Sequence, residues 1–246
     1  SIDNNSTSYG ASGANSIAGG SLAKATGSSS VAIGNTSTAT STSAFAVGNE
    51  ASASGLRAVA IGYKASATGS NSYSLSAYGS ATRDYSATLF GAKATASIEG
   101  KAAYGPAYLV GQGEVQGGML VCTVQTTDAT ASTLTTTNGT AGTTNQVILP
   151  NNSAYAFHGT IVARQKASEG TASAAWKVEG LIRREGSAGT TVLVNSATTV
   201  LDNTPSWGMA LTADTTNGGL AITVTGAAAT NIRWVATINT SEVTYA

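Results

Sequence analysis

Large apolar residues return every 14 positions along the first hundred residues of the chain. The phrase Val-Ala-Ile-Gly at 31–34 recurs as Phe-Ala-Val-Gly at 45–48 and as Val-Ala-Ile-Gly at 59–62. A second phrase, Ala-x-Ala-x-Gly, keeps the same spacing at 51–55 and 65–69. The period continues beyond the last of these glycines. Large apolar residues recur every 14 positions at Ile33, Val47, Ile61, Leu75 and Leu89, although no glycine follows the last two. Because a fixed short period is typical of stacked units, the pattern predicts a solenoid.

Each period contains two short runs that are separated by bends. Alternation of large and small residues, as at 31–33, is typical of a strand, and the glycines mark the bends. A coil is therefore two strands and two turns, and about six coils stacked roughly 4.8 Å apart form a rod on the order of 30 Å long. We expect a row of Val, Ile and Ala inside the roll, with Ala, Ser and Thr on the alternate faces. Because so narrow a roll buries little of its surface, we expect it to associate with copies of itself.

Three of these phrases resemble a known family. Ser-Val-Ala-Ile-Gly at 30–34, Ala-x-Ala-x-Gly at 51–55 and Ala-Val-Ala-Ile-Gly at 58–62 are similar to the 14-residue head repeats of trimeric autotransporter adhesins, the YadA-like heads. The resemblance covers about the first 95 residues. It implies a left-handed parallel β-roll with three chains around one axis, and such repeats also occur in phage tail fibres. Irregular first and last coils are expected from the departures at Gly19, Ser41, Ser76, Arg83 and Phe90.

The pattern changes near residue 97. Residues 98–117 hold closely spaced glycines, one proline and no period, which predicts a junction between the roll at 1–97 and a domain at 118–246. That domain shows short alternating runs separated by turn residues, and no stretch supports a helix. Such a pattern favours an antiparallel β-sandwich of jelly-roll type in an all-β chain. The expected strands are 119–124, 146–149, 154–164, 174–183, 191–195, 198–201, 207–212, 219–225 and 232–239.

The large apolar residues available for the core of this domain are Phe157, Trp176, Trp207 and Trp234. In its short sequence phrases the domain resembles the C-terminal domains of some phage tail-fibre and tail-associated proteins. That resemblance rests on no functional motif, only on the phrases at 157–160, 174–180 and 231–237.

Composition narrows the classes of partner. Charged residues make up 10% of the 246 residues, against about 25% in an average globular domain, which is typical of an extracellular β fibre. Twelve basic residues balance twelve acidic ones, so no basic surface for nucleic acid or an anionic membrane is indicated. No apolar run reaches the roughly 18 residues of a membrane-spanning helix. We therefore expect neither nucleic-acid binding nor membrane insertion.

Candidate chemistry is sparse. Cys122 lies among apolar residues, as a small buried hydrophobe does, and we do not expect a reactive thiol. The only histidine, His158, lies inside an alternating run with no Asp or Cys in the local pattern, so we expect it to be structural. Metal sites built from His and Cys are excluded by their number, and no phosphate-binding loop occurs. No cofactor or metal is expected.

Carboxylate pairs are the remaining catalytic possibility, because glycoside hydrolysis needs two of them. Most candidates lie in turns or beside a basic residue, which favours a solvated surface role. We therefore do not expect an enzyme. The candidates are Asp128, Glu169, Glu179, Glu185, Asp202, Asp214 and Glu242.

A rod that ends in a compact β domain suits binding. The leading hypothesis is the distal part of a homotrimeric phage tail fibre in the virion tail, a receptor-binding protein that attaches the virion to host cell-surface glycan or lipopolysaccharide. The alternatives are the head of a bacterial trimeric autotransporter adhesin and a polysaccharide-depolymerising tailspike.

Receptor contacts are expected from about residue 117 onward, because the roll offers no concave pocket and few aromatic or charged groups. Exposed loops carry binding sites, and aromatic rings stack on sugar faces. The candidates are Trp207, Tyr155 and Asn203. A core position for Trp207 is the competing interpretation.

Overall fold

The computed structural model describes residues 9–106 and 111–245. Its contacts divide the chain into two units, Ser1–Gln116 and Gly117–Ala246. Within the described ranges the secondary structure is strands, with one short 3-10 helix at Ala188–Thr190. None of that part of the chain forms a helix with the length and apolar character needed to cross a membrane. The all-β prediction is confirmed.

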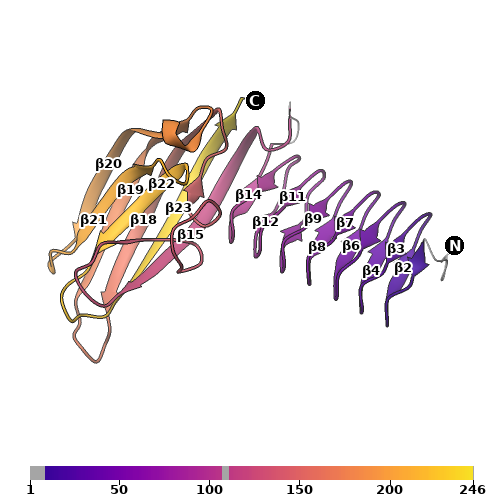
Figure 1. Ribbon diagram of the computed structural model, residues 1–246, viewed down its shortest axis with the longest axis horizontal. Helices are drawn as coiled ribbons and strands as arrows, with labels where there is room; N and C mark the ends of the chain where they lie inside the picture. Colours follow the sequence, from indigo (N-terminus) through magenta and orange to yellow (C-terminus); the bar gives the residue numbers. More distant parts are fainter. Residues whose placement is uncertain (1–8, 107–110, 246) are drawn as a thin grey trace. The chain divides into compact units, whose positions relative to one another are not determined.

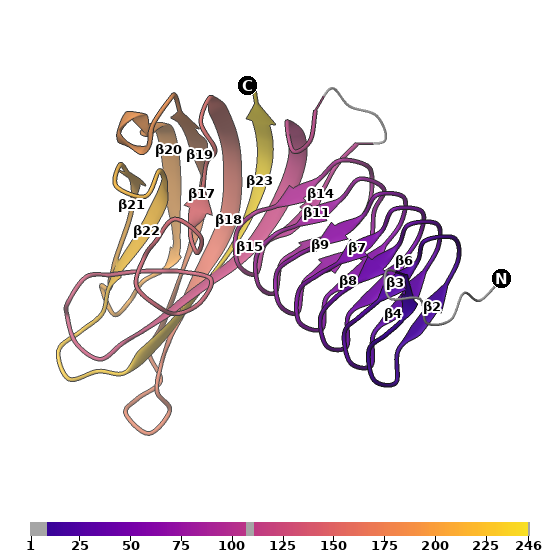
Figure 2. The ribbon, with the colours of Figure 1, turned by 45° about the vertical axis from the view of Figure 1, so that its right-hand side comes forward.

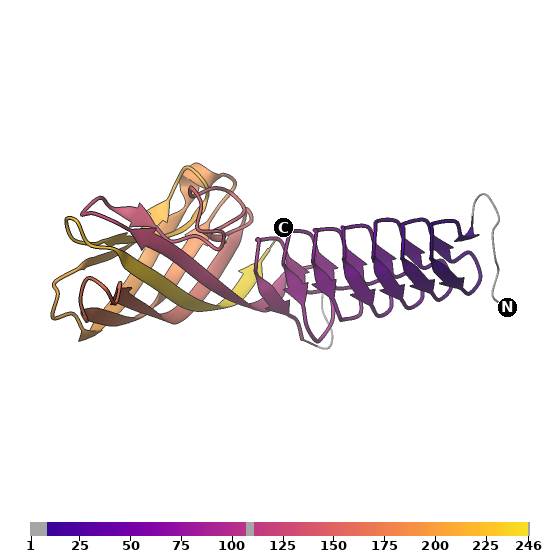
Figure 3. The same cartoon turned by 90° about the horizontal axis from the view of Figure 1, so that it is seen from below.

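The first unit is a roll of two parallel sheets, whose short strands alternate along the chain (Figures 1 and 3). One sheet contains β1 (Gly10–Ala11), β3 (Lys24–Ala25), β5 (Thr38–Ala39), β7 (Ser52–Ala53), β9 (Ser66–Ala67), β11 (Ser80–Ala81) and β13 (Thr95–Ala96). The other contains β2 (Ile17–Gly19), β4 (Val31–Ile33), β6 (Phe45–Val47), β8 (Val59–Ile61), β10 (Tyr73–Ser74), β12 (Ala87–Thr88) and β14 (Ala102–Tyr104). Within residues 9–106, seven strands in each row give seven coils, where the sequence predicted about six.

The inside of the roll is lined by alanine and serine, so the expected row of Val and Ile is wrong. Ala32, Ala46 and Ala60 are 0% exposed, whereas Ile33 and Ile61 are 44% and 40% exposed. With strands of only two or three residues between bends, the space between the two sheets is filled by small side chains, of which Thr88 is the largest on a strand of the regular coils. The large residues therefore point out of the roll, and the second residue of a strand, as in β4, β5 and β6, fills it.

Glycines allow the bends to stack. Gly34 and Gly48 have φ angles of 131° and 136°, which side-chain-bearing residues rarely adopt. A Cβ atom on Gly34 would also collide with the carbonyl oxygen of Gly48 in the next coil. The repeat glycines therefore set how closely successive coils approach.

The last coil is one residue longer than the others. Ser66 pairs with Ser80, 14 positions on, whereas Ser80 pairs with Thr95, 15 positions on. The extra residue lies close to Phe90, where the sequence predicted irregularity. Because β14 still pairs in parallel with β12, the roll continues into the segment where the sequence placed the junction.

The second unit contains two antiparallel sheets, as predicted. In the larger one the strands follow the order β15 (Val115–Thr126), β23 (Ile232–Thr244), β18 (Ser153–Gln165), β19 (Ser173–Arg184), β20 (Val192–Asp202). The smaller one contains β16 (Ser132–Thr133), β22 (Gly219–Thr225), β17 (Val147–Ile148) and β21 (Gly208–Asp214). Three consecutive strands, β18 to β20, with β23 returning beside β18 give the order of a Greek key.

Figure 2 shows the strands of the smaller sheet lying over those of the larger one. Aromatic rings from both sheets meet in one core. Trp207 precedes β21 of the smaller sheet, and its ring lies 5.6 Å from that of Trp234 on β23 of the larger sheet. The rings of Trp176 and Trp234 are stacked, with their centres 5.8 Å apart. Phe157, on β18, is also buried. The predicted core residues are therefore confirmed, including the core position for Trp207.

The runs at 191–195 and 198–201, expected as two strands, both fall within the single strand β20 (Val192–Asp202) except for Thr191, and β16 was not expected. Cys122 is buried and is a free cysteine, as expected of a small buried hydrophobe, and burial raises the pKa of its thiol to about 12.

Candidate functional site

The predicted receptor contacts lie inside the second unit or hold its turns. The side chains of Trp207 and Tyr155 are 5% and 3% exposed, the opposite of what stacking on a sugar requires. Asn203 brackets Trp207: its Oδ1 accepts from the Trp207 N–H at 2.9 Å, and its Nδ2 donates to the Trp207 carbonyl at 2.7 Å. These contacts close the turn before β21 and direct the indole inward.

Tyr155 belongs to a buried polar pair on the inner face of the larger sheet. Its register partner on β23 is Glu242, which accepts a hydrogen bond from the Thr240 hydroxyl at 2.6 Å. Burial raises the pKa of Tyr155 well above its ordinary value, and the charge of Glu242 and a hydrogen bond to it add to the shift. The phenol of Tyr155 therefore stays neutral, and it is hydrogen-bonded to Glu242 within the fold.

The carboxylates considered for hydrolysis have local partners. Asp128, Asp202 and Asp214 accept hydrogen bonds from residues in their own turns. Glu179 and Glu185 form exposed ion pairs with Lys177 and Arg183, at 3.5 Å and 3.0 Å. Each of these five side chains already has a local partner, whereas the sequence favoured a solvated surface role for them.

His158 is exposed on the outer face of β18. Its register partners are Glu179 on β19 and Asn239 on β23, with no Asp or Cys among them. Among the residues that the structure describes, no three His, Cys, Asp or Glu side chains gather to hold a metal ion.

The roll carries the exposed aromatic rings that the sequence analysis did not expect there. Tyr63 and Tyr78 meet edge to face at 5.0 Å on a bend shared by successive coils. The ammonium of Lys64 lies 5.4 Å and 5.9 Å from the two ring centres and 3.4 Å from the Glu50 carboxylate. Its hydrogen bond to Glu50 and the charge of that carboxylate raise the pKa of Lys64. Aromatic and charged groups are therefore present on the roll.

The outer faces of the two sheets of the roll differ in chemistry. The sheet from β1 to β13 presents mainly Thr and Ser at its outward positions, including Thr38, Ser52, Ser66 and Ser80. The sheet from β2 to β14 presents two columns of large apolar residues without a charged side chain. Those that are exposed are Ile17, Ile33, Phe45, Ile61, Tyr73, Leu75, Leu89 and Tyr104. One face of the roll is thus apolar along its whole length.

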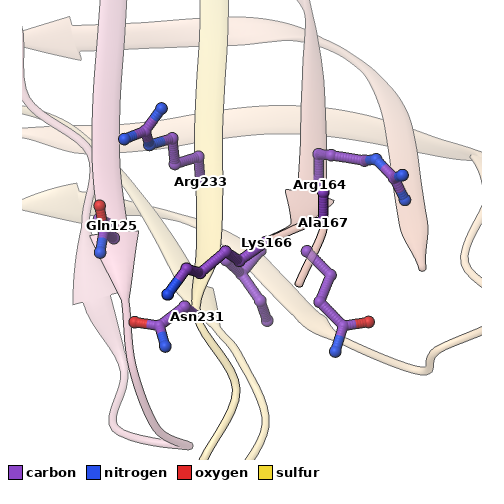
Figure 4. Close-up of a pocket in the computed structure, with 8 residues that line it drawn as sticks. Gln125, Arg164, Lys166, Ala167, Asn231 and Arg233 are labelled. Carbon is purple, nitrogen blue, oxygen red and sulfur yellow. The ribbon is translucent and has the colours of Figure 1, made fainter. Parts of the chain in front are cut away.

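The second unit has an open cavity of about 400 Å³ at the ends of β18 and β23 (Figure 4). Arg164 on β18 and Arg233 on β23 are directly opposite each other in the antiparallel register. In Figure 4 Lys166 extends in the direction of Gln125 and Asn231, whereas the guanidinium of Arg164 points to the other side. The lining is therefore basic, with amide groups beside the cations.

The first unit matches a known family model. The YadA head domain repeat matches in two copies, at residues 25–51 and 53–72. These YadA-like repeats cover the coils from β4 to β9, in which the period is most regular. The predicted resemblance is confirmed for this part of the chain.

Two solved structures are similar to longer stretches of the chain. One is the tailspike protein gp49 from Acinetobacter baumannii bacteriophage Fri1, a capsular polysaccharide depolymerase, at 7% identity and a TM-score of 0.29 over 79% of this chain and 40% of that one. The other is the Acinetobacter baumannii phage AM24 tailspike protein, at 9% identity and a TM-score of 0.25 over 91% of this chain and 47% of that one. This chain thus spans less than half the length of either. No curated protein matches its sequence.

The basic cavity was not predicted from the sequence. Its two arginines are 69 positions apart and meet only through the pairing of β18 with β23. The available signal was an outward-facing arginine near the end of each strand, which alternation alone could not bring together.

Proposed function

We propose that this chain is the distal part of a homotrimeric phage tail fibre, carried on the virion tail, that attaches the particle to host cell-surface glycan or lipopolysaccharide. The observation that carries the proposal is the apolar outer face of the roll, from Ile17 to Tyr104. An uncharged face repeated coil after coil needs an equally long, regular and apolar partner. Further copies of the same roll supply such a partner.

A trimer has a direct consequence for binding. Three copies of the second unit present three equivalent sites, and linked sites can raise avidity by about 10² to 10⁴ without any new contact. The second unit remains the proposed binding part, because its open cavity gives it a concave surface.

We also propose that the chain binds without cleaving. The local ion pairs and turn contacts of Glu179, Glu185 and Asp214 support this reading. Depolymerisation by a tailspike is the alternative, and an assay for new reducing ends on host polysaccharide tests it directly.

The head of a bacterial trimeric adhesin is a second candidate function. The two matching YadA head repeats favour it, because they describe the roll alone and fit an adhesin as well as a fibre. Competition with phage adsorption separates the two functions. A fibre binds the same receptor as its phage and should block adsorption, whereas an adhesin head has no need to bind that receptor.

The test uses the full chain with a fluorescent label. We expect saturable binding to some strains of a bacterial panel, and protection of those strains from adsorption of the phage that infects them. Removal of surface polysaccharide from the same strains should abolish binding. Binding that leaves phage adsorption unchanged would contradict the fibre and favour the adhesin, and release of reducing ends would contradict a purely binding role.

A further inference from the structure

A second open cavity of the second unit, of about 460 Å³, lies at one end of three neighbouring strands of the larger sheet. The middle strand is β18, between β23 and β19. Ala154 on β18 is the register partner of both Val243 on β23 and Arg183 on β19, so the three side chains form one row on the outer face. Because alanine is much shorter than its two neighbours, the row is hollow at its centre.

A second row of residues closes the end of the cavity. The N–H of Asn152 donates to the carbonyl of Glu185 at 3.2 Å, and the carbonyl of Asn152 accepts from the N–H of Tyr245 at 2.9 Å. These backbone bonds continue the pairing one residue beyond the start of β18 and hold the three residues side by side. Glu185 and Tyr245 each follow a residue of the first row by two positions, which puts them on the same face. All three residues line the cavity.

The two walls of the cavity differ in chemistry. The β23 side has Val243 and the ring of Tyr245, which is 87% exposed. The β19 side has the ion pair of Arg183 with Glu185 at 3.0 Å, in which both side chains are more than half exposed. Within such a pair the guanidinium keeps further N–H donors and the carboxylate keeps a second oxygen. One wall is therefore apolar and aromatic, and the other offers donors and acceptors without net charge.

A sugar ring has the same division of surface. A pyranose presents C–H groups on its faces, on which aromatic rings stack, and hydroxyls around its rim, which donate and accept hydrogen bonds. An anionic sugar would be attracted by Arg183 but repelled by Glu185, so the lining favours an uncharged one. An extended peptide cannot add a strand to the floor of the cavity, because β18 is already paired on both sides.

We propose that this cavity binds an uncharged pyranose unit of a glycan, with Tyr245 stacked on the ring and with Arg183, Glu185 and Asn152 as partners of its hydroxyls. Ala154 forms the floor, and its small side chain leaves room for the ring. The inference rests on the proposed function, and it names the site and the class of glycan that the second unit recognises.

The test measures the binding of four soluble probes to the full chain by saturation-transfer NMR titration. Three are neutral oligomers, of glucose, of galactose and of N-acetylglucosamine, and the fourth is an oligogalacturonate of equal length. At least one neutral oligomer should bind, and it should bind more tightly than the acidic one. Binding of each variant to host cells is measured in parallel.

Two substitutions test the floor and the aromatic wall. Ala154→Phe fills the cavity and should abolish binding without removing a proposed contact, and its melting temperature should stay close to that of the wild type because the side chain points outward. Tyr245→Ala should weaken binding by about tenfold or more, as for an aromatic residue at the centre of a binding site. Tyr245→Phe should retain binding, because the ring and not its hydroxyl stacks on the sugar.

The polar wall and the control complete the set. Arg183→Gln should weaken binding by about twofold to tenfold, as expected for a lost hydrogen bond. Tyr85→Ala is the matched control, since it removes another exposed tyrosine, on a bend of the roll and outside the cavity. It should leave the binding of probes and of host cells unchanged.

Unchanged probe binding by both Ala154→Phe and Tyr245→Ala, or tighter binding of oligogalacturonate than of any neutral oligomer, would overturn the inference. Failure of all three neutral oligomers to bind, with host-cell binding preserved, would overturn the sugar site alone. Loss of probe binding in Tyr245→Ala with unchanged binding to host cells would overturn its role in recognition of the receptor. Probe binding by a wild-type chain that binds no host cell would overturn the proposed function and keep the site.

Discussion

Tyr78 lies on a bend of the roll with its ring open to solvent, whereas Trp207 is enclosed by the core of the second unit. At Trp207 one neighbouring side chain holds the turn. Asn203 ties both backbone groups of Trp207, and this fixes the direction in which the indole enters the core. An aromatic residue after a turn is therefore weak evidence for a binding surface when an Asn four positions earlier can close the turn on it.

Asp214 controls another turn, and its ionisation should set part of the acid stability. Its carboxylate accepts from the N–H groups of Thr216 and Asn217, both at 2.9 Å, and from the side chains of Asn217 at 2.7 Å and Gln146 at 3.0 Å. Burial acts to raise the pKa of Asp214, but these hydrogen bonds outweigh it and lower the pKa below its usual value.

Because the folded pKa is depressed, the carboxylate stabilises the fold above its ordinary pKa, and this contribution is lost as pH falls through the folded pKa. We expect Asp214→Asn to reduce the free energy of unfolding by about 1–2 kcal/mol at neutral pH and to matter less in acid. Chemical unfolding at neutral and acid pH measures this. Glu179→Gln, which removes an exposed ion pair, is the control and should change little. An equal loss at both pH values would show that geometry and not charge is responsible.

At the scale of single strands, the width of the roll decides which residues fit inside. Ala60 is completely buried between the two sheets, and the same position is filled by Ala32 and Ala46 in other coils. We expect Ala60→Leu to destabilise the roll by about 1–3 kcal/mol or more, because the extra methylenes have no space. Thermal unfolding of the full chain measures it.

Ser66→Leu, on the outer face of β9, is the matched control, since it adds a leucine to the same coil without filling the interior. An unchanged melting temperature for Ala60→Leu would mean that the interior is wider than the structure shows.

The sequence predicted the period and the strands but assigned the wrong face to the large residues. Alternation at 31–33 shows that Val31 and Ile33 point away from Ala32, yet it is symmetric between inside and outside. A one-residue change of phase exchanges every side chain between the faces. The decisive information is how little space the two sheets leave between them, and it shows only in the folded roll, where Ala32, Ala46 and Ala60 are completely buried.

In the second unit, β20 shows the opposite kind of error. The run Asn195-Ser196-Ala197 has low intrinsic strand preference and therefore predicts a break. Pairing with β19 carries the strand through it, with irregular register on either side at Ala175/Trp176 and Leu181/Ile182. Tertiary pairing here overrides local preference.

At the scale of the molecule, the predictable part is the architecture and the unpredictable part is the surface chemistry. A repeat and its apolar phase are local in sequence, so the roll could be recognised. The basic cavity depends on Arg164 meeting Arg233 through a register that only the folded sheet defines. The buried position of Tyr155 likewise depends on Glu242, 87 positions later.

Self-association is the property of the whole chain that the exposed apolar face predicts most directly. We expect light scattering at micromolar concentration to give three times the 24.3 kDa of one chain. Ile61 lies in the middle of the apolar columns at β8, so Ile61→Asp would place an unpaired charge among apolar side chains in each of three copies. Burying such a charge costs several kcal/mol, about 2–7 even for an uncharged polar group.

The variant should therefore shift toward the mass of a single chain. The interior of each roll should stay intact, because Ile61 does not fill it. Ser66→Asp adds the same charge to the polar outer face of the same coil and should leave the mass unchanged. A wild-type mass of 24.3 kDa would refute self-association through this face. Equal dissociation by both variants would show that net charge, and not the apolar columns, governs assembly.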